Sequence, residues 1–240
     1  MAIYAISDLH LSIKSNKPMD VFGPLWQDYT NKIINSWQSV VNDDDLVIIG
    51  GDISWAMYLE DACDDLALLN SLNGTKLIHR GNHDYWWQSA SKMKKFFLEN
   101  SFLTLNILQN SSYIYKDTAI CGVRLWEIPK SENFKKDDLK IYERELIRLE
   151  LSLKDMEQKI SKSDSPIKSR IVSFHYPPLK DGEIDENVFS LLKRYDVNKC
   201  VYGHIHSHNR LNYPACEKEG ITFNLVSCDN LDFKPYNLDF

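Results

Sequence analysis

The sequence lacks several features that would place it in a specialised class of protein. It has no apolar run of about 18 residues or more, so it offers no candidate transmembrane helix. Its five cysteines are scattered and form no CxxC pair, which argues against a disulfide framework and a zinc knuckle. The 28 Lys and Arg are outnumbered by 34 Asp and Glu, so the composition shows no basic face for duplex nucleic acid. With 43% hydrophobic residues, disorder is also excluded as the main state.

The amino-terminal stretch MAIYAISDLHLS does not have the pattern of a signal peptide. Its apolar part is short, has no basic leader and runs directly into charged residues. Together with the unpaired cysteines, this predicts a cytoplasmic protein. A chain of 240 residues is long enough for one continuous core, and we expect a single domain over 1–240.

Short strands and amphipathic helices alternate along the chain. Several of the strands are apolar on both faces, as in LVII and KCVY, which is typical of strands buried between two layers. The alternation predicts an α/β fold with helices outside a sheet core. We expect strands at 2–7, 46–49, 76–79, 113–115, 119–123, 170–174, 199–202 and 221–226, and helices at 25–41, 61–72, 89–99 and 185–195.

The segment from Asp138 to Ile160 differs from the rest, because its apolar residues recur at alternating spacings of three and four. This predicts a long helix within an insertion at about 130–165. Its apolar stripe could dock on the protein's own body, form a lid, or pair with a second copy of the chain to give a homodimer. Ile147 and Leu151 widen the stripe, which favours docking on the body. The repeating residues are Leu139, Tyr142, Leu146, Leu149, Leu153, Met156 and Ile160.

Five short polar signatures follow predicted strands, where α/β sheets gather their ligand sites. Taken singly, each could be a turn or a satisfied polar residue, although GNHD is a specific string. Their joint occurrence in this order predicts a polynuclear metal site. The signatures are D-x-H at Asp8 and His10, G-D at Gly51 and Asp52, GNHD at 81–84, His175 before Tyr-Pro-Pro, and GHIH at 203–206.

The set of motifs resembles the calcineurin-like metallophosphoesterase superfamily, over nearly the whole chain from Asp8 to His206. The forms DLHLS, GGDISWAM, RGNHDYWW, HYPP and GHIH are most similar to uncharacterised bacterial phosphohydrolases of that superfamily. The resemblance implies a four-layer α/β/β/α sandwich with a long helical insertion and a centre of two divalent metal ions. It also implies that Asp8, His10, Asp52 and His206 hold one ion and that Asp52, Asn82, His175 and His204 hold the other.

The chemistry of these donors suits manganese, iron, zinc or cobalt, with manganese the first choice in vitro. Two such ions can activate a bridging hydroxide and clamp both ends of an in-line displacement. By the same resemblance, His83 stays off the metals and protonates the departing oxygen, and Asp84 orients it.

Several residues near the motifs are candidates for substrate contact. Arg124 could bind a phosphate or form a structural ion pair, whereas Arg80 is expected in a structural ion pair. Trp55 and Trp86 could stack on a base or line an apolar pocket, although residues of this kind belong more often to the core. The same alternatives apply to Tyr58, Tyr85, Trp87 and Tyr176. Of the other histidines, His79 is expected in the core and His208 at the surface.

The motifs thus predict a metal-dependent phosphoesterase acting on a small or nucleotide-like phosphodiester or phosphomonoester. The arginine pair of the Ser/Thr protein phosphatases is missing from the ISWAM stretch after Asp52, which disfavours that subgroup. A nuclease of the same superfamily is one alternative, against which the acidic composition counts. A non-catalytic scaffold or interaction protein is the other, although every ligand position is present. No membrane or nucleic-acid partner is expected.

Overall fold

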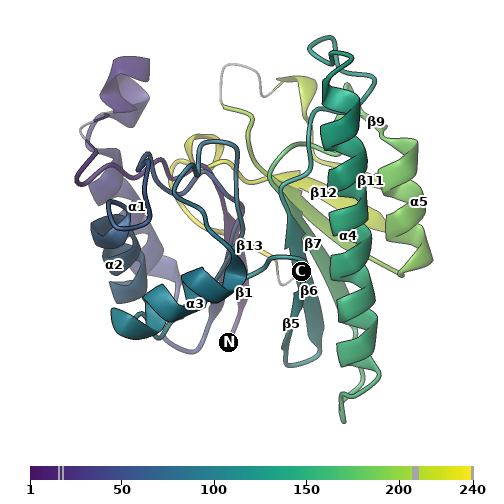
Figure 1. The fold of residues 1–240 in the computed structure, drawn as a ribbon, viewed down its shortest axis with the longest axis horizontal. Helices are drawn as coiled ribbons and strands as arrows, with labels where there is room; N and C mark the ends of the chain where they lie inside the picture. The colour runs from purple at the N-terminus through teal and green to yellow at the C-terminus, as the bar shows by residue number, and fades with distance from the viewer. Residues whose placement is uncertain (16, 18, 207–210, 239–240) are drawn as a thin grey trace. The chain divides into compact units, whose positions relative to one another are not determined.

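The computed structural model describes residues 1–15, 17, 19–206 and 211–238, so His208 lies outside the described residues. None of the helices in this part of the chain is long and apolar enough to cross a membrane. The chain forms two compact units (Figure 1). The first unit comprises Met1–Ile107 and Val226–Phe240, and the second comprises Leu108–Leu225.

The first unit is built on a five-stranded sheet in the order β13-β1-β2-β3-β4. Strands β1 to β4 run parallel, and β13 pairs antiparallel with β1 at the edge. Every residue of β1 and β2 is buried, as the apolar runs IYAI and LVII predict. The strands are β1 (Ile3–Ile6), β2 (Leu46–Ile49), β3 (Thr75–Ile78), β4 (Leu105–Ile107) and β13 (Tyr236–Asn237).

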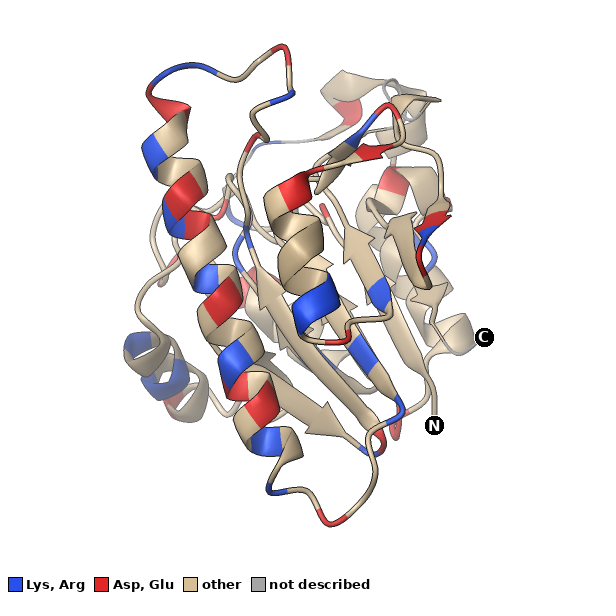
Figure 2. Cartoon of the chain, turned by 90° about the vertical axis from the view of Figure 1, so that its right-hand side faces the viewer, with Lys and Arg blue, Asp and Glu red and all other residues tan. Residues whose placement is uncertain are grey.

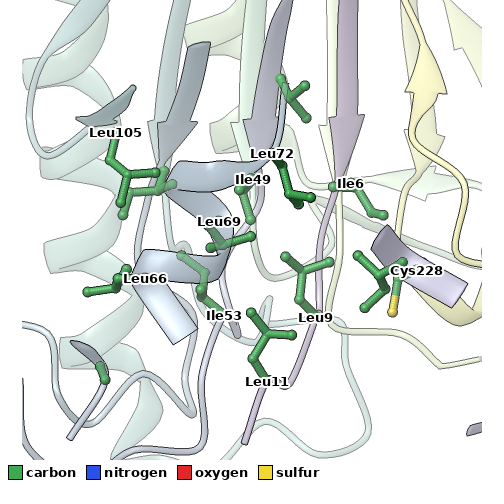
Figure 3. Packing of buried hydrophobic residues seen from close by; sticks show 14 of the residues in the cluster. Ile6, Leu9, Leu11, Ile49, Ile53, Leu66, Leu69, Leu72, Leu105 and Cys228 are labelled. Atoms are coloured by element: carbon green, nitrogen blue, oxygen red, sulfur yellow. The ribbon is translucent and has the colours of Figure 1, made fainter. Parts of the chain in front are cut away.

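Three α-helices and three short 3-10 helices complete the first unit. The helix expected over 25–41 begins only after Asp28, whose positive φ of 54° interrupts the helical path. Figure 3 shows Leu66 and Leu69 of α2 in the core of this unit with Ile49 of β2 and Ile53. Burying each such side chain stabilises the fold by about 1.5–3 kcal/mol. The helices are η1 (Met19–Phe22), η2 (Pro24–Trp26), α1 (Tyr29–Val40), α2 (Cys63–Ser71), α3 (Ala90–Glu99) and η4 (Cys228–Leu231).

The second unit contains a six-stranded sheet in the order β11-β12-β10-β7-β6-β5 and a two-stranded hairpin. The four inner strands run parallel, and β11 and β5 are antiparallel at the edges. Each unit therefore has the sheet and helices that an α/β sandwich requires. The elements are β5 (Ser112–Tyr115), β6 (Thr118–Val123), α4 (Asp138–Ile160), β7 (Ser169–Phe174), β8 (Leu179–Lys180), β9 (Glu183–Ile184), α5 (Glu186–Arg194), β10 (Lys199–Tyr202), β11 (Cys216–Lys218) and β12 (Ile221–Leu225).

Helix α4 spans the predicted residues and docks on its own unit, so the docking prediction is confirmed. Leu149, Leu153 and Met156 are buried in the core of the second unit, where α4 contacts β5 and β6. The argument from Ile147 and Leu151 was wrong, because these side chains are 60% and 45% exposed. Figure 2 shows acidic and basic residues interspersed along the outward side of this helix.

Candidate metal centre

Three loops of the first unit leave the carboxyl ends of β1, β2 and β3 and carry the predicted ligands. Asp8, His10 and Asp52 adopt positive φ values of 58°, 47° and 50°. Residues other than glycine rarely take this conformation, and it is concentrated at functional sites. The chain therefore turns sharply at the residues that the motifs single out.

The loops after β1 and β2 continue to pair beyond the ends of their strands. These backbone hydrogen bonds fix the D-x-H motif against the G-D motif. They run from the N–H of Asp8 to the carbonyl of Gly51 (3.0 Å), from His10 to Asp52 (2.9 Å), and from Leu11 to Ile53 (2.9 Å).

The ligand candidates of the first unit converge in space. Asp8 and His10 offer ligand atoms within 4.8 Å of each other, and His10 Nε2 lies 4.0 Å from Asp52 Oδ2. The other oxygen of Asp52 accepts the backbone N–H of His83 at 2.8 Å. Asp8, His10 and Asp52 are buried, so their donor atoms form an imidazole and carboxylate set that suits a transition-metal ion.

The electrostatics of this cluster favour a cation. Burial raises the pKa of Asp52 well above its ordinary value, and the charges of Asp8 and Asp84 raise it further. The backbone N–H groups of His83 and Asn82 act in the opposite sense. Carboxylates that repel one another in a buried site are stabilised when a divalent ion neutralises them.

Two glycines allow the loops after β2 and β3 to lie in contact. A Cβ on Gly81 would lie 2.1 Å from Asp52 Oδ1, and a Cβ on Gly51 would lie 2.6 Å from the Gly81 nitrogen. Gly51 also has a positive φ of 90°. The glycines of G-D and GNHD are therefore needed for the close approach of the two loops.

Asp84 joins the same two loops through its carboxylate. Its oxygens accept five N–H donors, and its role in orienting His83 stays a prediction. Burial raises the pKa of Asp84, and its backbone N–H donors oppose that effect. The donors are the backbone N–H groups of Gly81 (2.7 Å), Asp52 (2.9 Å), Ile53 (2.8 Å) and Ser54 (3.3 Å), and Trp86 Nε1 (3.1 Å).

The two predicted tryptophans differ in position. Trp55 stacks on His10 with ring centroids 4.8 Å apart and lies 4.6 Å from the ring of His83. Trp86 has no exposed surface and donates to Asp84, so its ring is not accessible to a substrate. Trp55 therefore remains a candidate for the substrate side of the site, and Trp86 supports Asp84.

The second unit carries three further predicted ligands, His175, His204 and His206, after the ends of β7 and β10. His175 and His204 offer ligand atoms within 4.8 Å of each other, and their ring centroids are 5.2 Å apart. Tyr176 packs on His204 at 4.1 Å between centroids. His206 follows two residues later and is half-buried. This pair of imidazoles is a second potential metal-binding element.

The two arginines have different surroundings, and Arg124 takes the ion pair that was one of its two predicted alternatives. Arg124 Nη2 donates to Glu145 Oε1 of α4 at 3.0 Å, and its guanidinium lies 4.6 Å from the ring centroid of Trp126. Its side chain is 12% exposed, which favours a structural role. Arg80 was expected in a structural ion pair, but among the described residues it has no carboxylate partner, so that expectation was wrong.

A family model described as Calcineurin-like phosphoesterase matches residues 1–208. The chain belongs to this family. Membership confirms the resemblance to the metallophosphoesterases. Together with the two α/β units, it also confirms the predicted α/β sandwich. It implies phosphoester hydrolysis with divalent metal ions, and the match includes both histidines of GHIH.

Two solved structures show the same fold at low sequence identity. The protein TT1561 of Thermus thermophilus is 12% identical, with a TM-score of 0.52 over 98% of this chain and 96% of that chain. A second structure is 11% identical, with a TM-score of 0.53 over 92% of this chain and 88% of that chain. The protein of unknown function AQ665 from Aquifex aeolicus is 14% identical, with a TM-score of 0.49 over 98% and 95% of the two chains. No curated protein matches the sequence.

Proposed function

We propose that the protein hydrolyses a small or nucleotide-like phosphate ester, either a diester or a monoester, with two divalent metal ions. The observation that carries this proposal is the cluster of Asp8, His10 and Asp52. It is buried, its donors suit a transition metal, and its own charges raise the pKa of Asp52. A bound cation would neutralise the carboxylates that repel one another. The family to which the chain belongs indicates that the reaction is phosphoester hydrolysis.

The motifs supply the ligand sets of this proposal. When bound, the two ions activate water and stabilise the charge that develops on the phosphoryl group. Manganese is the proposed ion in vitro, and a single cytoplasmic domain is proposed for 1–240. One ion takes Asp8, His10, Asp52 and His206, and the other takes Asp52, Asn82, His175 and His204.

The residues around the ligands have separate tasks in this proposal. His83 protonates the departing oxygen, a role that suits an imidazole near neutral pH. Trp55 packs against His83 and His10 and limits the positions that their rings can take. Asp84 holds the loops after β2 and β3, and Trp86 donates to that carboxylate.

The test uses protein that has been stripped of metal and reloaded with manganese. Hydrolysis of bis(p-nitrophenyl) phosphate and p-nitrophenyl phosphate is followed side by side. We expect turnover that depends on manganese, and the preferred substrate identifies the ester class. Absence of turnover with both ions bound would contradict hydrolysis of simple esters and favour a non-catalytic role.

A further inference from the structure

A buried carboxylate outside every motif joins two of the ligand-bearing loops. Asp65 lies in α2 and is 1% exposed. Its Oδ1 accepts the backbone N–H of Ile13 at 2.9 Å, and its Oδ2 accepts the hydroxyl of Ser54. The same carboxylate thus contacts the loop after β1 and the loop after β2.

Each of these contacts leads to a ligand candidate within a few residues. Ile13 follows His10 by three positions, and Ser54 follows Asp52 by two. The Ser54 hydroxyl also accepts the N–H of Ala56 at 3.1 Å, which turns the chain directly after the ligand. A displacement of the Ser54 side chain would therefore be transmitted to Asp52 along a short, hydrogen-bonded stretch of backbone.

Helix α2 gives this carboxylate a rigid support. Leu66 and Leu69 of the helix are fully buried in the core of the first unit (Figure 3). Asp65 follows Ala62 by three residues and precedes Leu69 by four, so it lies on the same helix face as the apolar stripe predicted for 61–72. An acidic residue in the buried stripe of a helix was the one sequence signal that could have identified it.

We propose that Asp65 is a positioning residue for the metal centre. By holding the backbone at Ile13 and the side chain of Ser54, it sets His10 and Asp52 at the separation that ion binding requires. Carboxylates that orient metal ligands typically contribute about 10–100-fold to metal affinity. The inference rests on the proposed function, since it concerns ions that this function requires.

The chain offers a matched control in Asp45, which precedes β2 and so lies at the other end of that strand from Asp52. Asp45 is 2% exposed and accepts the backbone N–H groups of Ala2 and Asn42 and the side-chain amide of Asn42. It resembles Asp65 in burial and in the number of loops that it joins. None of its hydrogen-bond partners in the described part of the chain belongs to a ligand-bearing loop.

The experiment measures manganese affinity by titration calorimetry and thermal unfolding in the same full-length variants. We expect Asp65→Ala and Asp45→Ala to lower the unfolding temperature to a similar extent. Asp65→Ala should weaken manganese binding about 10–100-fold, whereas Asp45→Ala should leave it within about twofold. Asp65→Asn should recover most of the affinity, because its amide can accept from Ile13 and donate to Ser54.

A second, milder variant protects the test against a failure of Asp65→Ala to fold. Ser54→Ala removes only the hydroxyl and should weaken manganese binding in the same direction. Unchanged affinity in both Asp65→Ala and Ser54→Ala, or an equal loss in Asp45→Ala, would overturn the proposal for Asp65. Wild-type protein that binds no manganese would instead contradict the proposed function, and the inference with it.

Discussion

The two ends of the five-stranded sheet use buried carboxylates in opposite ways. At the amino end of β2, burial would raise the pKa of Asp45, but hydrogen bonds from Asn42 and Ala2 lower it below its ordinary value. At the carboxyl end, burial and the charges of Asp8 and Asp84 raise the pKa of Asp52. Hydrogen bonds favour the charged form of Asp45, whereas burial and the neighbouring carboxylates disfavour the charged form of Asp52, and a bound cation would oppose both effects. Partners, rather than burial, therefore distinguish a structural acid from a functional one.

The largest effect should come from removing the charge at the carboxyl end. Asp52→Asn keeps an oxygen for the backbone N–H of His83 but weakens the ion site, so we expect hydrolysis to fall roughly a thousandfold. The unfolding temperature of the metal-free protein should not fall, because a repulsive charge has been removed. Steady-state kinetics and calorimetry check both outcomes. Full activity in Asp52→Asn would show that the Asp52 carboxylate is not needed for ion binding, contrary to the comparison with Asp45.

A variant of His83 tests whether different residues at the carboxyl end of the sheet bind the ions and transfer the proton. His83→Ala should lower turnover by about a hundredfold, the lower end of what general acid catalysis contributes, while retaining both manganese ions, because the ring is proposed to act on the leaving group. Turnover and metal content by elemental analysis are the measurements. Loss of an ion would place His83 among the ligands, and unchanged turnover would remove it from the mechanism.

Lys76 lies at the amino end of the sheet and tests whether a buried charged group there has only a structural role. Its Nζ is buried and donates to the carbonyls of Leu72 and Gly74, and burial lowers its pKa to about 8. Between pH 8 and 10.5 the unfolded chain therefore binds more protons than the folded chain, so the free energy of unfolding should rise with pH across this window. We expect a gain of about 2 kcal/mol.

Denaturant unfolding of the wild type and of Lys76→Met at several pH values isolates this contribution. The difference between the two proteins removes the effect of other groups that titrate in the same range. An equal pH dependence in both would show that Lys76 does not titrate as its burial implies. Metal affinity should be the same in both, since Lys76 contacts no ligand-bearing loop in the described part of the chain.

Among the variants at the site, the smallest effect on activity is expected for Trp86→Phe, which removes one of the five donors to Asp84. The loss of one hydrogen bond to a buried carboxylate should cost about 1–3 kcal/mol of stability. Activity should change only a few-fold, because four backbone donors remain. Chemical unfolding and kinetics on the same samples check this. A loss of activity as large as that of Asp52→Asn would mean that Trp86 has a direct part in the reaction.

Much of the fold could be predicted because its strands are apolar on both faces. The runs LVII and KCVY occupy β2 and β10, and the repeat over Asp138 to Ile160 coincides with α4. The short strands β4, β8, β9, β11 and β13 were not predicted, since two or three residues carry too little periodicity. The break at Asp28 depends on a local backbone conformation that the pattern does not encode.

The sequence allowed the site residues that directly follow a strand to be predicted. It did not reveal residues whose hydrogen-bond partners are distant in the sequence. The placement of Asp8, Asp52 and GNHD after β1, β2 and β3 followed from the motifs alone. Three of the five donors to Asp84 come from a loop about 30 residues earlier in the chain, so no local pattern reveals them. Asp65 likewise contacts two loops that are distant in sequence. The ligand roles themselves stay predictions until ions are measured.

The most direct measurement is a calorimetric titration of manganese into the metal-free wild-type protein, followed by thermal unfolding of the loaded sample. We predict two ions for each chain and a rise in the unfolding temperature, because ions that bind only the folded state stabilise it. Absence of binding, with the unfolding temperature unchanged, would contradict the claim that the buried acids at the carboxyl end of the sheet form a metal centre.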